Sequence, residues 1–287
     1  MHTKWIIIEP VGGLCNRLRA IASALVLGGH LNRRVYLNWQ AEHSCNCTFT
    51  DLFRKNEFLD FTGGWRGKVR TMFLNRERSR LLIDQEKLHE LEYQIPTTQF
   101  DKYRILYFPS CYSDFIPRDY PAERYVDRVS MYLNKLEPID LVLQRLFKLP
   151  PATVGVHIRR TDNTPAVERS RDDDFIRAMK AHLSGRPETH FYCATDDLEV
   201  EKHLVEIFGD RIISFPKTSY DRNTREAIQE ALVDLLMLSS TESILGSWWS
   251  SFSEYASLFN RIPLDIAGHG VWEGPVKTII NRAQEAN

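Results

Sequence analysis

The stretch "VGVHIRRTDN", residues 154–163, decides the fold of the second half of the chain. Its apolar start is typical of a buried β-strand, and the strand pattern ends in two adjacent arginines, Arg159 and Arg160. Two neighbouring guanidinium groups repel each other, so we expect an acidic ligand at this strand end. Surface ion pairing with Asp162 and Asp172 is the alternative explanation for the two arginines.

Strand and helix patterns alternate from this stretch onward. The predicted strands are 152–158, 190–195, 211–215 and 243–247, and the predicted helices are 172–183, 198–208, 224–240 and 250–259. This alternation with short connections is typical of a parallel sheet that helices cover on both faces. The second half therefore reads as a nucleotide-binding α/β domain.

The first half opens with the same pattern. Its predicted elements are a strand at 5–9, a helix at 17–27 ended by Gly28 and Gly29, strands at 33–39 and 104–109, and a helix near 121–134. Pro150-Pro151 disfavours both a helix and a central strand, so we place a domain boundary there. We expect an α/β protein with two Rossmann-like domains, 1–150 and 151–287.

Composition limits the classes of function. The 37 Lys and Arg residues nearly balance the 38 Asp and Glu residues, and a net charge of −1 argues against a nucleic-acid partner. No stretch approaches the ~18 apolar residues of a membrane span, so we expect a soluble, cytoplasmic protein, with a peripheral membrane location as the alternative.

The cysteines point to thiols in a reducing compartment. Five cysteines are an odd number without framework spacing, which favours reduced thiols. Cys45 and Cys47 lie near His43 and could seed a metal site, but a fourth ligand is missing, so we interpret them as ordinary thiols.

The segment "GGLCNRLRA" (12–20) joins the first strand to the first helix. Glycines such as Gly13 let backbone N–H groups approach a ligand, and Asn16 is placed to cap the helix, whose N-terminus favours an anion. A tight βα turn without a ligand is the alternative. The segment matches neither the Walker A nor the G-x-G-x-x-G pattern.

The arginines of "HIRRTD" suit an anionic ligand. Ligands of parallel α/β sheets lie beyond the carboxyl ends of the strands, and a guanidinium can bind a phosphate through two hydrogen bonds. His157 lies on the opposite pleat from Val156 and Ile158. We expect its ring to face a packed layer and to hydrogen-bond locally, at the border of the ligand site.

Acidic residues follow the next strand in "ATDD" (194–197). Asp196 and Asp197 can accept from a nucleobase or a ribose hydroxyl, and either can instead cap the following helix. The triplet at 172–174 begins a helix, where capping and the macrodipole stabilise acids, so we reject an Asp-x-Asp metal site and expect no metal.

The segment "LGSWWSSFSEYA" (245–256) leads from a strand into a helix. Its hydroxyls belong to Ser247, Ser250, Ser251 and Ser253. With the free N–H groups of a helix N-terminus they can form a phosphate cradle. We interpret Trp248 and Trp249 as packing residues, and sugar stacking is the alternative.

Four segments now coincide: "GGLCNRL", "HIRRTD", "ATDD" and "ALVDLLMLSSTESILGSWWSSFS", in this order over nearly the whole chain. Together they resemble the fucosyltransferase superfamily that includes the bacterial nodulation α1,6-fucosyltransferases and the protein O-fucosyltransferases. The resemblance implies a GT-B fold, with an acceptor-side N-terminal domain and a C-terminal domain for GDP-fucose facing a central cleft. It also implies inverting, metal-independent transfer to a glycan or other hydroxyl acceptor, with no cofactor.

The resemblance assigns roles to individual residues. Arg159 and Arg160 look like the paired arginines of the family, at least one of them bound to the diphosphate, and Asp196 and Asp197 look like its nucleotide-contacting acids. Further matches are Asp234 for the acid on the long helix, Ser250 with Ser251 for the phosphate-contacting serine, and Asn16 and Arg17 for the glycine-loop positions facing the donor.

The sequence departs from the family pattern at two places. Cys15 stands where the family usually has glycine, and Asn163 stands where the core-fucosylating branch has lysine. The catalytic glutamate of that branch would align with Val167, one residue short of Glu168. Glu168 and Asp162 are therefore the candidates for a catalytic base, and a strongly dissociative transition state that needs little base is the alternative.

The resemblance also answers why two arginines meet at a strand end. Negative charge builds on the leaving β-phosphate when the bond to GDP breaks, and the arginine pair can stabilise that charge without a metal. Two other functions stay open: transfer from a different nucleotide sugar, and nucleotide-sugar binding without transfer. The stretch 40–120 has no readable motif, so the sequence does not name the acceptor.

Overall fold

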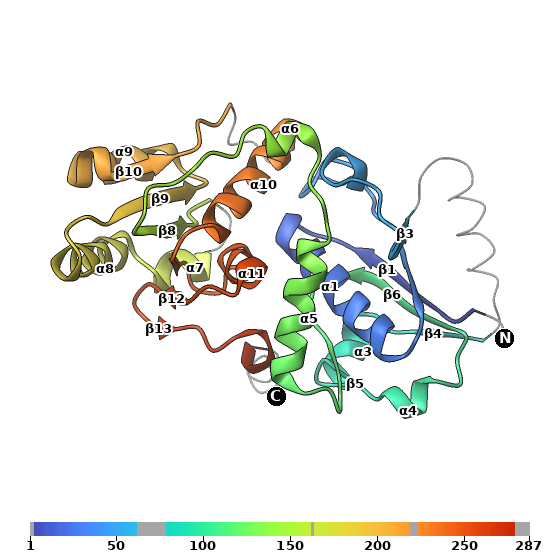
Figure 1. The fold of residues 1–287 in the computed structure, drawn as a ribbon. Coiled ribbons are helices and arrows are strands. Elements are labelled where there is room, and N and C mark those ends of the chain that lie inside the picture. Colours follow the sequence, from blue (N-terminus) through green and yellow to red (C-terminus); the bar gives the residue numbers. More distant parts are fainter. Residues whose placement is uncertain (1–2, 62–78, 162–163, 219–222, 279–287) are drawn as a thin grey trace. The chain divides into compact units, whose positions relative to one another are not determined.

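The computed structural model describes residues 3–61, 79–161, 164–218 and 223–278 (Figure 1). The chain divides into two compact units, Met1–Ile139 with Glu273–Asn287, and Asp140–Trp272. The sequence placed the boundary at Pro150-Pro151. The division falls earlier because the short helix α6 (Asp140–Leu143) contacts α10 (Arg225–Ser239) of the second unit.

The first unit is built on a five-stranded parallel sheet with the order β3-β2-β1-β6-β4. Its strands are β1 (Trp5–Pro10), β2 (Arg34–Leu37), β3 (Leu59–Phe61), β4 (Arg80–Leu82) and β6 (Ile105–Cys111). β1 lies at the centre and is almost wholly buried, as expected from the unbroken apolar run 5–8.

Helix α1 (Leu14–His30) follows β1 and packs against it. The sequence analysis ended this helix at Gly28, and that prediction was wrong. A Cβ on Gly28 would lie 2.7 Å from Val35 Cγ2 and 3.0 Å from the carbonyl oxygen of Arg33. Gly28 therefore serves the close packing of α1 against the strand β2, and the helix continues for another half turn.

Short elements fill the stretch that carried no sequence motif. They are η1 (Phe49–Asp51), α3 (Gln85–Glu90), β5 (Gln94–Ile95), α4 (Thr97–Phe100) and β7 (Ile116–Pro117), and the longer helix α5 (Ala122–Asn134) follows them. β5 and β7 form a small parallel pair of their own, and α5 packs on α1 through Tyr125, Val129 and Leu133. The predicted helix near 121–134 is confirmed by α5.

The second unit contains a six-stranded sheet with the order β10-β9-β8-β11-β12-β13, parallel except for β13. Its strands are β8 (Thr153–Ile158), β9 (His190–Thr195), β10 (Ile212–Ser214), β11 (Ser243–Gly246), β12 (Leu264–Ile266) and β13 (Gly270–Val271). Its other elements are α7 (Thr164–Arg169), α8 (Asp172–Gly185), α9 (Leu198–Phe208), η2 (Gly209–Arg211) and α11 (Ser251–Asn260). The alternation predicted from the sequence is confirmed.

Helices cover this sheet on both faces, as β8 shows. Val154, Val156 and Ile158 point into an apolar cluster with residues of α8 and α9. The alternate residues point the other way, since Gly155 meets side chains at the end of α10 and His157 stacks on Phe252 of α11. The central strand is thus buried from both sides and can place only its end residues at the surface.

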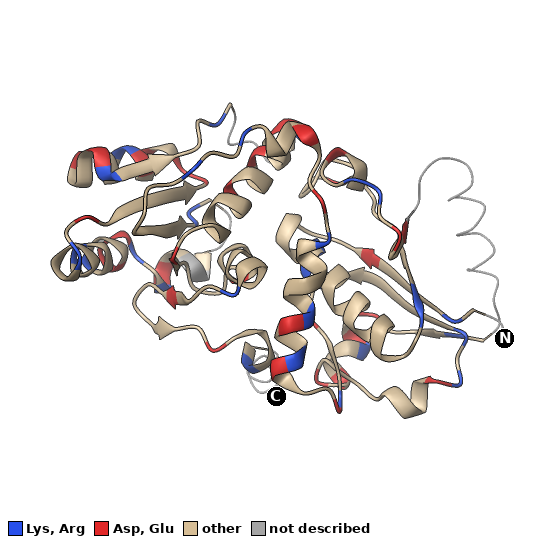
Figure 2. Ribbon diagram, viewed as in Figure 1, with Lys and Arg blue, Asp and Glu red and all other residues tan. Residues whose placement is uncertain are grey.

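The charged residues and the cysteines are distributed as in an ordinary globular protein. Acidic and basic residues are interspersed along helices such as α5 (Figure 2). All five cysteines are free and buried, and the Cys45 and Cys47 sulfur atoms lie 3.7 Å apart. Over the ranges that the structure describes, no helix combines the length and apolar character needed to cross a bilayer.

Candidate functional site

Three strand ends meet at the carboxyl edge of the second sheet. β9, β8 and β11 are adjacent and parallel, so the residues that follow them gather at one edge. These residues are Asp196 and Asp197 after β9, Arg159 and Arg160 after β8, and Ser247 to Ser251 after β11. The structure thus brings together most of the residues that the sequence assigned to the donor site.

Arg159 is tied through its backbone to the serine loop. Its N–H donates to Ser247 Oγ over 3.0 Å, and Ser247 Oγ donates to the carbonyl oxygen of His157 over 3.1 Å. Ser247 is completely buried. The end of β8 and the end of β11 are therefore held together by one serine, and the half-buried Arg159 is positioned from that junction.

Arg160 is used differently from its neighbour. Its Nε donates to Asp172 Oδ1 over 2.9 Å, its Nη2 contacts the same oxygen, and its Nη1 donates to the carbonyl oxygen of Arg159 over 2.8 Å. The guanidinium also lies over the ring of Phe175. Ion pairing with Asp172, which the sequence analysis kept as the alternative for the pair, is thus present for Arg160.

The two acids after β9 have different hydrogen-bond partners. Asp196 accepts from the backbone N–H of Arg160 over 2.7 Å and from Thr161 Oγ1 over 2.8 Å, so it holds the loop after β8. Asp197 is the N-cap of α9 and accepts from the N–H of Glu199 over 2.9 Å. One acid of the pair therefore caps the helix, as one reading of "ATDD" predicted. Their contact with a nucleotide stays a prediction.

Ser250 presents the least satisfied polar group of this edge. It is the N-cap residue of α11, only 1% exposed, and its side chain makes no capping bond. Ser250 Oγ has no hydrogen-bond partner among the described residues. A buried hydroxyl without a partner costs free energy, so its presence at a helix N-terminus indicates a place for an anion. Ser251, the first residue of α11, is half-buried beside it.

The start of α11 is pressed tightly onto the sheet. A Cβ on Gly246 would lie 2.6 Å from the Cβ of Ser253, so only glycine allows this approach. His157 Nδ1 lies 3.3 Å from Ser253 Oγ, and its ring stacks on Phe252 with centroids 4.8 Å apart. His157 therefore packs and hydrogen-bonds locally as predicted, and its contact with a donor stays a prediction.

Trp248 packs as predicted. Its backbone N–H donates to Ser170 Oγ over 3.0 Å, its ring lies 4.3 Å from that of His269, and the guanidinium of Arg169 lies 4.9 Å from the ring centroid. Its indole Nε1 is buried without a hydrogen-bond partner among the described residues. Ser170 and His269 carried no motif and were not identified from the sequence.

Asp234 on α10 belongs to a buried network. Tyr192 Oη donates to it over 2.7 Å, and Lys217 Nζ lies 2.8 Å from its other oxygen. Burial raises the pKa of Asp234, and the Lys217 ammonium opposes that shift. Lys217 also donates to the carbonyl oxygen of Thr195 at the end of β9. The sequence analysis missed Lys217, whose only signal is its place just after a strand.

The glycine loop of the first unit is internally satisfied. Gly13 is the N-cap of α1 and Asn16 lies inside the first turn, so the prediction that Asn16 caps the helix was wrong. Arg17 is fully buried and donates to the carbonyl oxygens of Gly12 and Gln40 and to Glu42 Oε1, over 2.8, 2.7 and 2.7 Å. Arg17 thus shapes its own loop, and the predicted donor contacts of the loop stay predictions.

The candidate bases lie in a sparsely described part of the second unit. Asp162 and Asn163 fall outside the described residues. Glu168 is exposed on α7, and Val167 is half-buried there. Within the described ranges, no group of three or more His, Cys, Asp or Glu side chains could hold a metal ion.

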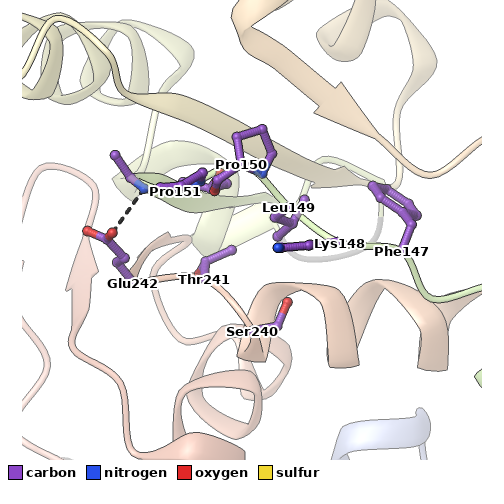
Figure 3. A pocket seen from close by; sticks show the side chains of 10 residues that line it. Phe147, Lys148, Leu149, Pro150, Pro151, Ser240, Thr241 and Glu242 are labelled. Carbon is purple, nitrogen blue, oxygen red and sulfur yellow. Dashed lines mark hydrogen bonds between the residues drawn. The ribbon is translucent and has the colours of Figure 1, made fainter.

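A pocket of about 320 Å³ lies at the opposite end of β8 (Figure 3). Its lining includes Lys148, Pro150, Pro151 and Thr241, and Glu242 Oε1 beside it accepts from the N–H of Ala152 over 2.9 Å. It surrounds the amino end of the strand whose carboxyl end carries Arg159. This pocket is therefore separate from the edge that holds the predicted donor residues.

Comparison with known proteins decides the fold. No protein-family model matches the chain, and no curated protein matches it by sequence. Solved structures match it closely, among them the NodZ alpha-1,6-fucosyltransferase soaked with GDP-fucose, with a TM-score of 0.65, 16% identity, and coverage of 96% of this chain and 100% of that chain. The chain has the fold of the fucosyltransferases. The α/β fold expected from the resemblance is confirmed.

Two further structures support the same fold. A mutant of Arabidopsis thaliana FUT1 in complex with GDP matches with a TM-score of 0.64 at 14% identity, covering 92% of this chain and 70% of that chain. POFUT1 in complex with GDP-fucose matches with a TM-score of 0.59 at 10% identity, covering 93% and 98%. The shared architecture thus extends over nearly the whole chain despite low identity.

Proposed function

We propose that this protein transfers fucose from GDP-fucose to a hydroxyl acceptor, with inversion and without a metal ion. The fold is that of fucosyltransferases whose structures contain GDP-fucose or GDP. The observation that carries the proposal is the buried Ser250 Oγ at the N-terminus of α11, which has no partner in the part of the chain that the structure describes and lies beside the strand end that holds Arg159. A diphosphate would supply the missing acceptor atoms there.

Arg159 is the residue that we assign to the leaving group. The guanidinium of Arg160 donates to Asp172 and to the carbonyl oxygen of Arg159, and the Asp172 carboxylate balances its charge. Arg159 would bind the β-phosphate and stabilise the negative charge that grows as the bond to the anomeric carbon breaks. Arg160 would act indirectly, because it fixes the carbonyl group that precedes it in the chain.

The N-terminus of α11 would hold the rest of the diphosphate. Its first N–H groups point out of the helix, and the macrodipole favours a negative charge there. Ser250 Oγ would donate to a phosphate oxygen, and so would the buried indole Nε1 of Trp248 if the phosphate reaches it. These donors are fixed before the ligand arrives, so binding needs little rearrangement.

A metal ion is not needed in this scheme, because fixed donors and Arg159 supply the positive charge. Two of the three acids at 172–174 are engaged in other contacts. Asp172 pairs with Arg160, and Asp174 accepts from the N–H of Arg171 over 3.1 Å and lies 3.2 Å from Arg177. These contacts support helix capping as the role of the triplet.

Release of GDP from GDP-fucose in the presence of EDTA tests the proposal. We expect the full chain to release GDP with the chelator present, faster once a glycan acceptor from an array screen is added. Release only from another nucleotide sugar would change the assigned donor. Binding of GDP-fucose without release under every acceptor condition would leave a binding protein, and a requirement for Mg²⁺ or Mn²⁺ would refute the metal-free scheme.

A further inference from the structure

Trp249 adopts a backbone conformation that bulky residues avoid. Its φ is +50°, in the left-handed region, which is unfavourable for a residue with a Cβ atom. Its side chain is nevertheless 45% exposed. Strained backbone positions cluster at ligand sites, and nearly half of the surface of Trp249 stays open to a ligand.

The neighbouring tryptophan already does the packing in this loop. Trp248 contacts Ser170, His269 and Arg169. The two adjacent tryptophans therefore differ: Trp248 packs against residues of the second unit, and Trp249 is exposed. Our sequence interpretation of both as packing residues does not fit Trp249.

The position of Trp249 places it beside the proposed diphosphate site. It directly precedes Ser250, the N-cap of α11 with its unpartnered hydroxyl. A ligand anchored there by a diphosphate would carry its sugar outward from the helix N-terminus, within reach of a side chain one residue away. The strain at Trp249 thus coincides with the place where a sugar would leave the anion site.

We propose that the exposed indole of Trp249 is a stacking surface for the apolar face of a pyranose ring. The inference rests on the proposed function, since it takes the diphosphate site at Ser250 as its anchor. One face of a pyranose carries C–H groups, which pack against the electron-rich face of an aromatic ring. The sugar can belong to the donor or to the acceptor, and the chemistry of the contact is the same in both cases.

The test uses Trp249→Gly in the full chain, beside Trp249→Phe. Glycine accepts a positive φ without strain, so Trp249→Gly should keep or raise the melting temperature while it removes the ring. Trp249→Phe should retain part of the sugar affinity. Val205→Ala is the control, because Val205 is an equally exposed apolar residue at 45% on α9, away from this edge.

The donor arm compares the affinities for GDP and GDP-fucose by calorimetry. If the ring stacks on the donor sugar, Trp249→Gly should weaken GDP-fucose binding about fivefold and leave GDP binding unchanged, the size expected of one aromatic contact. The acceptor arm measures binding of the parent and the variant to a glycan array in the presence of GDP. A loss confined to the array would assign the ring to the acceptor sugar.

The two failures are distinguishable. A parent chain that binds neither GDP nor GDP-fucose would refute the proposed function, and the role of Trp249 with it. A parent that binds both, with a Trp249→Gly variant that changes neither the affinity ratio nor the array signal, would refute the stacking role alone. A large fall in melting temperature for Trp249→Gly would show a structural residue instead.

Discussion

The loop after β1 and the loop after β11 both join a parallel strand to a helix, yet their polar groups are used differently. In the first loop the buried Arg17 donates to two backbone carbonyl groups and to Glu42, which also accepts from the N–H of Gly12. In the second loop two buried polar atoms, Ser250 Oγ and Trp248 Nε1, have no partner among the described residues.

We interpret this difference through the proposed function, in which the second loop binds the diphosphate. Proteins pair nearly all buried polar groups, so the unpaired ones mark places where free energy has been given up for another purpose. The first loop would keep its shape with nothing bound. Under our proposal, the second would gain free energy when phosphate oxygens accept from Ser250 Oγ and Trp248 Nε1.

The largest expected effect comes from Arg159→Ala. Arg159 follows β8, and its backbone N–H donates to Ser247 of the second loop. Removal of one donor that stabilises a developing negative charge costs about 2.7–4 kcal/mol, so the rate of GDP release should fall at least about a hundredfold. The melting temperature should change little. Initial rates and thermal unfolding measured together check both statements.

Arg160→Ala is the matched comparison for that experiment. Because Arg160 holds Asp172 and a backbone carbonyl oxygen, we expect its loss to lower the unfolding free energy by about 1–2 kcal/mol. Arg159→Lys should rescue poorly, since an ammonium lacks the paired donors of a guanidinium. Near-parental turnover in Arg159→Ala would remove Arg159 from the leaving-group role.

A smaller effect, on stability, is expected from Arg17→Met in the first loop. Methionine keeps much of the buried volume, but the carbonyl groups of Gly12 and Gln40 lose their donor, at a cost of about 3 kcal/mol in unfolding free energy. Urea unfolding followed by tryptophan fluorescence measures it. The affinity of the folded variant for GDP should stay near that of the parent. A tenfold loss of GDP affinity with unchanged stability would show that the first loop binds the ligand instead.

The sequence was sufficient for most of the fold because the signals were local. The strands β8 and β9 and the helix α10 follow from apolar runs and helical spacing, which depend on neighbours in the chain. The end of α1 was mispredicted because Gly28 packs against Val35 of β2 and against Arg33 just before that strand, a contact that periodicity does not contain.

The sequence predicted which residues gather at the strand ends of the second unit, but not how they pair with one another. Motifs named Arg159, Arg160 and Asp196, since each stands at a strand end. Which arginine pairs with Asp172 depends on the rotamers at the start of α8, and Lys217 reaches Asp234 only through the fold. Hydrogen-bond partners far apart in sequence leave no periodic signal, so the sequence did not predict that Arg160 pairs with Asp172.

The smallest effect, and the most direct test of the unpaired hydroxyl, is Ser250→Ala. The N-cap serine makes no capping bond, so alanine should not lower stability and can raise it by about 1 kcal/mol by removing a buried unsatisfied group. GDP affinity should fall about tenfold, the value of one hydrogen bond to a charged phosphate.

Thr224→Ala is the control, because Thr224 Oγ1 does cap α10 by accepting from the N–H of Ala227 over 3.2 Å. That variant should lose about 1 kcal/mol of stability and keep its GDP affinity. Calorimetry and thermal unfolding on both variants would give opposite patterns if the second loop is built for an anion. Equal losses of stability, with GDP affinity unchanged in both, would make Ser250 an ordinary cap.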